Sequence, residues 1–197
     1  MVSSPGAQSR RLFFALWPDA DVRRQLYAAA GAVHAACGGR SMREENLHLT
    51  LAFLGAVAPE RIATVFDLAA TVVMPCFDWQ LDRLGSFRRI AWLGGETVPA
   101  LSELAKQLAQ RLRQQGFSIE ERPFAAHVTL VRDAHCERLV SVAPPLPIVW
   151  AVKEFVLVES QAAAGGVRYV VIGRWPLPAD KTTRAINPPP DRASKSK

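Results

Sequence analysis

The feature that most constrains the fold of this chain is a His-x-Thr sequence that occurs twice, each time within an apolar run. The first copy is His48-Leu49-Thr50-Leu51 and the second is His127-Val128-Thr129-Leu130, so the histidines are 79 residues apart. A strand at residues 11–16 and a helix from about residue 20 recur at the same offset as a strand at 90–93 and a helix from about residue 99. This common offset predicts a duplicated strand–helix–strand unit, whose two histidine strands face each other across a pseudo-twofold axis.

Hydrophobic periodicity places further elements along the chain. Beyond the strands of the repeat, we expect strands at 46–54, 77–84, 124–131, 152–158 and 167–172, and helices at 20–36, 59–73 and 98–115. We also expect a bend at Gly85-Ser86 and a hairpin connection at residues 162–166.

The composition favours one folded domain. The chain has 197 residues, of which 49% are hydrophobic, which suits one substantial core but not two separate enzymatic domains. We expect a flexible N-terminus at residues 1–9, a single domain at residues 10–177 and a disordered basic tail at residues 178–197. The sequence contains no run of about 20 apolar residues and no signal-like segment, so we expect a cytoplasmic protein that does not bind membranes.

Charge and cysteine content narrow the classes of partner. The net charge is +6, and half of this excess lies in the basic tail. A cationic surplus suits a polyanion such as nucleic acid, because lysine and arginine attract phosphate and release its counterions. The three cysteines are scattered and form no C-x-x-C pair, so neither a disulfide framework nor a zinc site is expected.

The His-x-Thr pattern has a chemical meaning on a strand. Side chains alternate across a strand, so His48 shares one face with Thr50, and His127 shares one face with Thr129. Threonine hydroxyls can donate hydrogen bonds to phosphate oxygens, and an imidazole with a pKa of roughly 6.5 exchanges protons near neutral pH. A single His-x-Thr is more often an ordinary strand segment, but two copies at a common offset argue against coincidence.

Two imidazoles can supply both proton transfers of phosphodiester hydrolysis, so no metal and no other cofactor is expected. Arg132 would add a cationic fork for the phosphate. Its offset of five residues from His127 is odd, so a bulge or the strand's end must turn it inward. Of the early aromatic residues, we expect Phe13 in the core and retain Phe14 as a candidate for stacking on a nucleobase.

A resemblance to a known family rests on four segments: Arg11-Leu12-Phe13-Phe14-Ala15-Leu16, Asn46-Leu47-His48-Leu49-Thr50-Leu51-Ala52-Phe53-Leu54-Gly55, Ala91-Trp92-Leu93-Gly94, and Phe124-Ala125-Ala126-His127-Val128-Thr129-Leu130-Val131-Arg132. Through them the chain resembles the two-histidine phosphoesterase superfamily, and specifically its bacterial RNA 2',3'-cyclic phosphodiesterase branch, the LigT/ThpR or 2'-5' RNA ligase family. The resemblance covers nearly the whole folded region, and the second segment is the most specific. One departure is Ala126, where the family commonly has proline; alanine relaxes the backbone there without removing a catalytic group.

The resemblance implies an α+β, bilobal fold with pseudo-twofold symmetry, in which two antiparallel sheets form a central cleft and helices pack outside. It implies a metal-independent hydrolase that opens RNA 2',3'-cyclic phosphate ends to 2'-phosphomonoesters and can also join RNA ends reversibly through a 2'-5' linkage without a nucleotide cofactor. By this resemblance His48 is the general acid on ribose O3' and His127 is the general base for water. Thr50, Thr129 and Arg132 would hold the phosphate.

Two alternatives stay open at the level of sequence. The same site could open a small cyclic nucleotide such as ADP-ribose 1'',2''-cyclic phosphate, because the motifs define the phosphate chemistry but not the leaving group. A noncatalytic RNA-end binding module would keep RNA affinity without turnover, although the intact histidines and threonines argue against it. The expected partners are therefore RNA ends carrying a 2',3'-cyclic phosphate, or cyclic nucleotides, and the expected state is a monomer.

Overall fold

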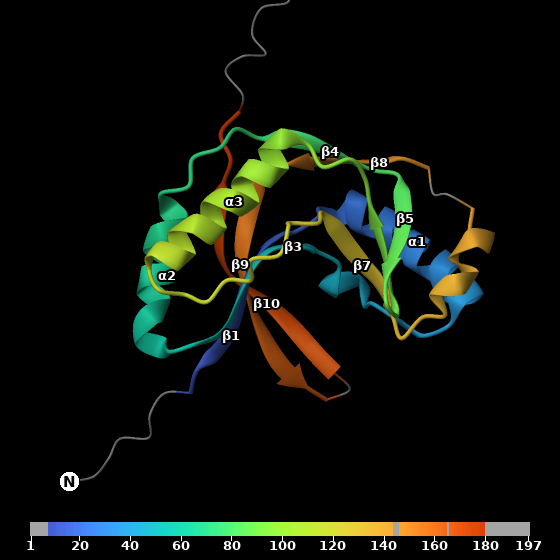
Figure 1. Ribbon diagram of the computed structural model, residues 1–197, viewed down its shortest axis with the longest axis horizontal. Coiled ribbons are helices and arrows are strands. Elements are labelled where there is room, and N and C mark those ends of the chain that lie inside the picture. Colours follow the sequence, from blue (N-terminus) through green and yellow to red (C-terminus); the bar gives the residue numbers. More distant parts are fainter. Residues whose placement is uncertain (1–7, 144–145, 165, 180–197) are drawn as a thin grey trace, which may run out of the picture.

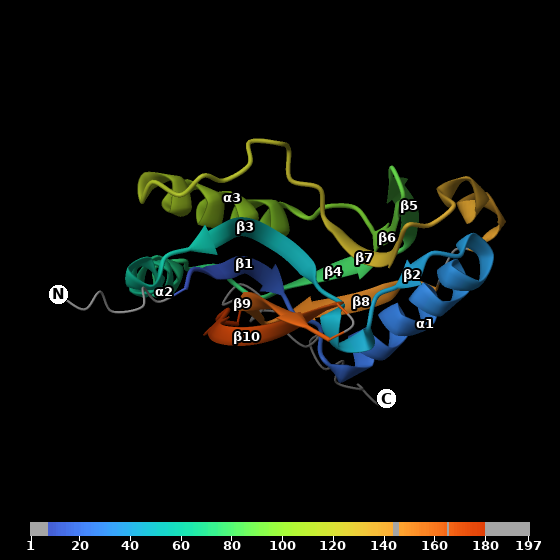
Figure 2. The same ribbon diagram turned by 90° about the horizontal axis from the view of Figure 1, so that it is seen from below.

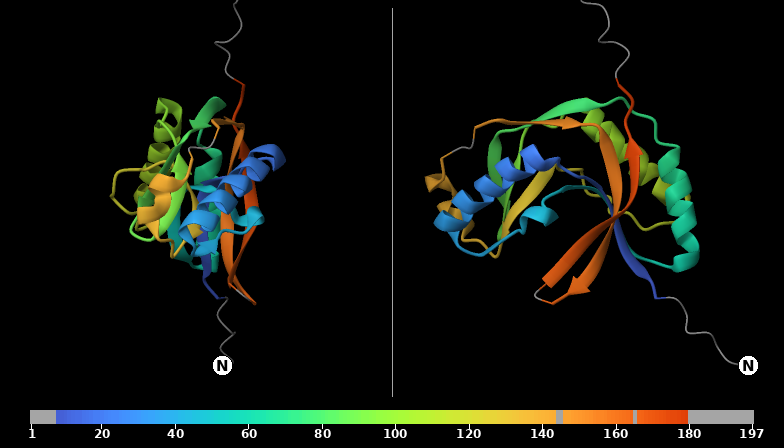
Figure 3. Two further views of the ribbon diagram at one scale, coloured as in Figure 1. Left: turned by 90° about the vertical axis from the view of Figure 1, so that its right-hand side faces the viewer. Right: turned by 180° about the vertical axis from the view of Figure 1, so that it is seen from behind.

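The chain folds around one large antiparallel sheet that is bent into an arch, with helices on its outer side (Figures 1 and 3). The structure, a computed structural model, describes residues 8–143, 146–164 and 166–179. The predicted N-terminal segment 1–9 and basic tail 178–197 lie almost wholly outside the described residues. The described helices and strands are β1 (Arg10–Leu16), α1 (Ala20–Cys37), β2 (Arg40–Ser41), β3 (Leu49–Val57), α2 (Ile62–Ala70), β4 (Phe77–Leu81), β5 (Arg83–Phe87), β6 (Ile90–Gly94), α3 (Pro99–Gln114), β7 (His127–Arg132), β8 (Ile148–Val152), β9 (Glu154–Ala163) and β10 (Gly166–Pro176), with 3-10 turns at Glu44–Asn46, Pro59–Arg61 and Cys136–Ser141.

The main sheet has the strand order β10-β9-β1-β3-β7-β6-β5, and the short β2 pairs with β7. The strands β4 and β8 form a separate two-stranded sheet. The two histidine strands, β3 and β7, lie at the centre and meet through one residue pair, Leu49 with Val128. The predicted α+β, two-lobed fold is therefore confirmed. The two sheets expected from the sequence correspond to the two halves of this sheet, which the central pair joins into one.

The helices cross over between the halves. The helix α1 follows β1 but packs against β7 and β8, whereas α3 follows β6 but packs against β3 and α2. In Figure 2 the two helices lie at diagonally opposite corners of the molecule, as a twofold relation requires. Each helix buries one apolar stripe and leaves its other side exposed, which is the pattern of a surface helix. In α3 the buried stripe is Leu101, Leu104, Ala105, Leu108 and Leu112.

The strand register refines the predicted repeat. The helices begin at Ala20 and Pro99, which keeps the 79-residue offset of the histidines. The first strands correspond at an offset of 77 instead, because Leu16 pairs with Leu49 in one half just as Leu93 pairs with Val128 in the other. The connection from β6 to α3 is therefore two residues longer than the connection from β1 to α1.

Some predicted boundaries were wrong. The bend expected at Gly85-Ser86 lies inside β5, and the chain turns at Arg88 and Arg89, where Arg88 has a φ of 53°. Gly85 is needed for a different reason: a Cβ there would collide with the ring of Trp92 on the neighbouring strand. The predicted helix at 59–73 starts as a 3-10 turn and ends at Ala70, and the short strands β2 and β8 were not predicted as separate elements.

Apolar side chains pack on both faces of the sheet. The larger cluster fills the space between the sheet and the helices and includes Phe14 and Trp79. A smaller cluster on the opposite face is formed by Phe13, Ala15, Val156 and Val158, with Trp17, Tyr169 and Val171 packed against it. Among the described residues, no helix is both long and apolar enough to cross a membrane.

Candidate active site

The site is built where the two histidine strands meet. Both side chains of the central residue pair between β3 and β7 are fully buried against the helix layer. The residues on either side of that pair point to the opposite face, because side chains alternate along a strand. Antiparallel pairing therefore sets His48 beside Thr129 and Thr50 beside His127. The two His–Thr pairs meet on the face that the helices leave uncovered.

Each histidine strand contains a β-bulge one residue after its threonine. Opposite β1, the register of β3 skips Leu51, and opposite β6, the register of β7 skips Leu130. An extra residue in one strand shifts the alternation of all the side chains that follow it. Phe53 and Arg132, which both lie three residues after a threonine, are therefore returned to the histidine face.

Arg132 faces the site because of the bulge at Leu130, which is one of the two arrangements that the sequence required. It lines the same cavity as His48 and Thr50. Its backbone is held by β2, in which Arg40 pairs with Arg132, and by the preceding glycine loop. Gly39 has a φ of +86°, and a Cβ there would collide with the Arg132 carbonyl oxygen, so the loop can approach this closely only with glycine.

The two histidines are anchored in the same way. Nδ1 of His48 lies 2.7 Å from the carbonyl oxygen of Asn46, and Nδ1 of His127 lies 2.7 Å from the carbonyl oxygen of Ala125. A carbonyl oxygen only accepts hydrogen bonds, so each Nδ1 must carry the proton and each Nε2 is left for the ligand. Asn46 is itself fixed by a hydrogen bond from its Nδ2 to the carbonyl oxygen of Val167 on β10.

Aromatic rings enclose the His48 imidazole. The ring of Phe13 lies 5.0 Å from it, that of Tyr169 5.1 Å, and that of Trp17 stacks on it at 5.6 Å. The pKa of His48 is lowered to about 4, mainly by the resulting desolvation; the hydrogen bond to the Asn46 carbonyl opposes this shift, and the charges of Arg132 and His127 add to it. His48 is therefore neutral at neutral pH in the unliganded protein.

A cavity of about 180 Å³ opens beside His48. Its lining contains two arginines and no carboxylate, which favours an anionic ligand. Within the described part of the chain, the side chains of Thr50, Thr129 and Arg132 make no hydrogen bond or ion pair, so their donors are available to such a ligand. Among the same residues, no group of three or more histidine, cysteine or acidic side chains could hold a metal ion. The lining is Arg11, Phe13, His48, Thr50, Phe53, Arg132, Ser160 and Tyr169.

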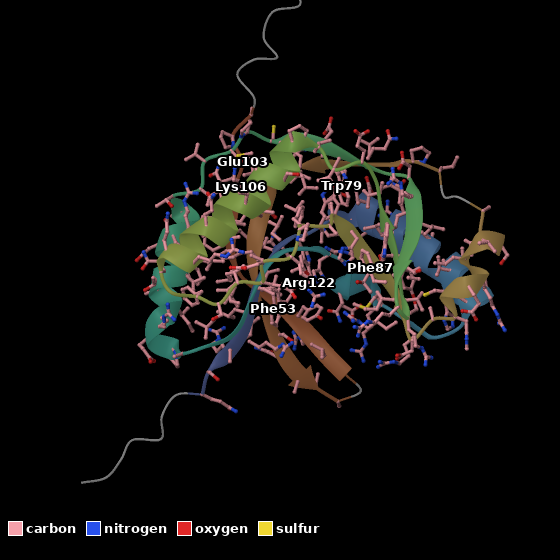
Figure 4. The ribbon with its side chains drawn as sticks, in the orientation of Figure 1. Phe53, Trp79, Phe87, Glu103, Lys106 and Arg122 are labelled. Carbon is pink, nitrogen blue, oxygen red and sulfur yellow. The ribbon has the colours of Figure 1, made fainter. Side chains whose placement is uncertain are left out.

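His127 and Thr129 do not line this cavity but adjoin it through the central strand pair. The His127 ring contacts the edge of Phe87, at 5.1 Å, and the ring of Trp92, at 6.2 Å. Phe53 of β3 and Phe87 of β5 lie on the two sides of the arch in Figure 4, and both are 43% exposed. The first half thus surrounds its histidine with aromatic rings more completely than the second half does.

The prediction for Phe14 was wrong. Phe14 is fully buried in the large core, where its ring contacts those of Phe155 and Trp175 at 6.0 and 5.8 Å. Phe13 is buried, as expected, but in the smaller cluster on the histidine face, where it also lines the cavity. The reason is the register of β1: Ala15 pairs with Thr50, so the odd-numbered residues of this strand share the face of the site.

Several residues of the site were not found from the sequence. Their positions follow from the pairing of β1 with β3 and β9 and of β9 with β10, which brings together segments more than 100 residues apart. Two of them, Arg11 and Phe53, lie within segments that carry the family resemblance, but nothing in those segments marks them as cavity residues. They are Arg11, Trp17, Phe53, Ser160 and Tyr169.

Comparison with known proteins agrees with this geometry. A family model described as "LigT like Phosphoesterase" matches the chain twice, over residues 16–92 and 93–169. The two matches begin 77 residues apart, as the first strands of the two halves do. The internal duplication is thus visible in the family model as well as in the structure.

Individual relatives cover most of the chain. The RNA 2',3'-cyclic phosphodiesterase of Escherichia coli (strain K12) is 37% identical over 87% of this chain and 98% of its own length. The protein of the same name from Thermotoga maritima is 32% identical over 68% of this chain and 78% of its own length. A crystal structure of E. coli LigT complexed with 3'-AMP superposes with a TM-score of 0.78 at 37% identity, covering 86% of this chain and 99% of that one. The chain belongs to the LigT-like phosphoesterase family of two-histidine phosphoesterases.

Proposed function

We propose that the protein is an RNA 2',3'-cyclic phosphodiesterase that hydrolyses terminal 2',3'-cyclic phosphates to 2'-phosphomonoesters. One observation carries the proposal: two imidazoles, each anchored through Nδ1 to a carbonyl oxygen, present Nε2 beside a cavity that holds Arg132 and no carboxylate. The names of the E. coli and T. maritima relatives support an RNA end as the substrate.

The proposed reaction needs one proton acceptor and one proton donor. Water attacks phosphorus and gives a proton to one imidazole, while the opposite imidazolium protonates the departing ribose O3'. The P–O3' bond breaks, which leaves the phosphate on O2' and a free 3'-hydroxyl. A 5'-hydroxyl in place of water would give a 2'-5' linkage by the same steps. Thr50, Thr129 and Arg132 would stabilise the charge on the phosphate oxygens.

The family resemblance makes His48 the acid, and this role requires a proton that the unliganded site disfavours. Desolvation lowers the pKa of His48 to about 4, and the Arg132 charge contributes to this shift. A bound phosphate places negative charge beside both groups and offsets this repulsion. We therefore propose that substrate binding itself protonates His48, and that His127 acts as the base.

Inorganic phosphate is accordingly expected to raise the pKa of His48 by at least about one unit, because an opposite charge within about 4–6 Å favours the charged imidazole. The measurement is an NMR titration of the His48 ring with and without phosphate, with His34, which is exposed on α1, as the internal control. A pKa that stays near 4 in the complex would mean that His48 works as the neutral base and that the two roles are exchanged.

Turnover of matched substrates tests the proposed function. In the presence of a chelator, kcat/KM is expected to be higher for an RNA oligonucleotide ending in a 2',3'-cyclic phosphate than for ADP-ribose 1'',2''-cyclic phosphate. The reverse preference would favour a small-nucleotide phosphodiesterase, and RNA binding without turnover would favour a noncatalytic module.

We also propose that the enzyme acts in the cytoplasm as a monomer. Light scattering should then give the mass of one chain.

A further inference from the structure

Arg11 is a second cation in the cavity, and the reaction as described does not use it. It lies two residues before Phe13 on the same face of β1 and lines the cavity with His48 and Arg132. Its guanidinium carbon lies 4.7 Å from the centre of the Phe53 ring. Within the described residues, the Arg11 side chain makes no ion pair or hydrogen bond. The guanidinium is thus held in place by a ring while its donors are left unused.

The position of Arg11 is separate from that of the reacting phosphate. Two residues of a strand span about 7 Å, so Arg11 lies about that far from Phe13 along β1. Phe13 contacts the His48 ring, and Arg132 is the arginine whose charge acts on the His48 pKa. Arg132 therefore accounts for the charge at the reaction centre, and Arg11 is available for a second anionic group further along the same cavity.

The pseudo-twofold relation supports the same division of roles. Phe53 occupies the position in β3 that Arg132 occupies in β7, three residues after the threonine and beyond the bulge. The first half therefore places an aromatic ring where the second half places the arginine of the reaction centre. That ring supports Arg11 from the neighbouring strand, and this arrangement makes the two halves different at the position where an asymmetric substrate must be oriented.

The chemistry of an RNA end supplies the second anion. A mononucleotide 2',3'-cyclic phosphate carries one phosphate, whereas an RNA end also carries the internucleotide phosphate on the 5' side of its terminal ribose. We infer that Arg11 binds this internucleotide phosphate, and so makes the enzyme prefer RNA ends to cyclic mononucleotides. Arginine suits the task, because its planar fork can donate two hydrogen bonds to one phosphate. The inference rests on the proposed function and names the part of the substrate that the site selects.

A different route for the RNA would run on the other side of Trp17. There a cavity of about 420 Å³ is lined by Trp17, Lys153, Glu154 and Arg174, among other residues. Its three cations, Arg23, Lys153 and Arg174, face two carboxylates, since Arg174 pairs with Glu154 and Asp19 also lines the cavity. The uncompensated charge of Arg11 makes the first cavity the better phosphate site. Lys153 is the group that tests the second route.

The experiment compares 2',3'-cyclic AMP with an adenosine dinucleotide that ends in a 2',3'-cyclic phosphate. Arg11→Ala is expected to lower kcat/KM for the dinucleotide by about tenfold or more. The same variant should change kcat/KM for 2',3'-cyclic AMP by less than about twofold. Arg11→Lys should keep part of the preference. Arg24→Ala, which removes an exposed arginine on α1, is the matched control for loss of one positive charge and should leave both values unchanged.

A third substrate tests whether Arg11 contacts the internucleotide phosphate itself. This substrate is the dinucleotide with a neutral methylphosphonate at its internucleotide linkage. For the unmodified enzyme, this change in the substrate should lower kcat/KM by about the same factor as Arg11→Ala lowers it for the normal dinucleotide. In Arg11→Ala, the methylphosphonate should lower kcat/KM little further. The inference would be overturned if Arg11→Ala lowered kcat/KM equally for both natural substrates, or for neither. It would also be overturned if Lys153→Ala, and not Arg11→Ala, lowered kcat/KM selectively for the dinucleotide. Failure of the unmodified enzyme to turn over either natural substrate would refute the proposed function, and the inference with it.

Discussion

Alanine in place of His48 or His127 is expected to lower kcat by about 10²- to 10⁴-fold in each single variant, because each imidazole performs one of the two proton transfers in the proposed mechanism. The double variant should be little slower than the more damaging single variant, since the two groups act as a unit. Single-turnover kinetics with an RNA 2',3'-cyclic phosphate, at saturating enzyme, measures the chemical step directly.

The histidine prediction needs a control for folding. His34→Ala removes an exposed histidine from α1 and should leave both kcat and the melting temperature unchanged. The two active-site variants should keep the far-UV circular dichroism spectrum of the unmodified protein, because His48 lines the cavity, His127 adjoins it, and neither ring belongs to the large core. A folded variant with unimpaired turnover would show that its histidine is structural.

Arg132→Ala is expected to lower kcat/KM by about 10²- to 10³-fold, which is typical for loss of one donor that stabilises transition-state charge. Arg132→Lys should restore only part of the activity, because lysine keeps the charge but cannot donate two parallel hydrogen bonds from a planar fork. In contrast to Arg11→Ala, the loss should be the same for mononucleotide and dinucleotide substrates. A loss confined to the dinucleotide would mean that Arg132 binds the RNA chain and not the reacting phosphate.

The sequence predicted the centre of the fold because the repeat constrains it. Two apolar strands carrying His-x-Thr at one offset required the pairs to meet, and the pairing of Leu49 with Val128 brings them together. The alternation rule also exposed the difficulty with Arg132 and named a bulge as one solution. The bulge at Leu130 is that solution, but alternation alone could not choose between it and the end of the strand.

The sequence could not decide which of two adjacent aromatic residues faces the site. Phe13 and Phe14 are equally apolar, and β1 is covered on both faces, so hydrophobicity does not distinguish them. The choice depends on the pairing of Ala15 with Thr50, which is a contact between distant segments. Tyr169 and Arg11 escaped prediction for the same reason, since each reaches the cavity only through strand pairing.

The position of phosphate in the product tests the central claim most directly. An RNA oligonucleotide ending in a 2',3'-cyclic phosphate is incubated with the protein and a chelator, and the terminal phosphate is assigned by ³¹P NMR. If His48 and His127 act on the two sides of the phosphate as proposed, the product is the 2'-phosphomonoester and it forms at an undiminished rate with the chelator present. A 3'-phosphate product, or activity that returns only on addition of a metal ion, would contradict the account.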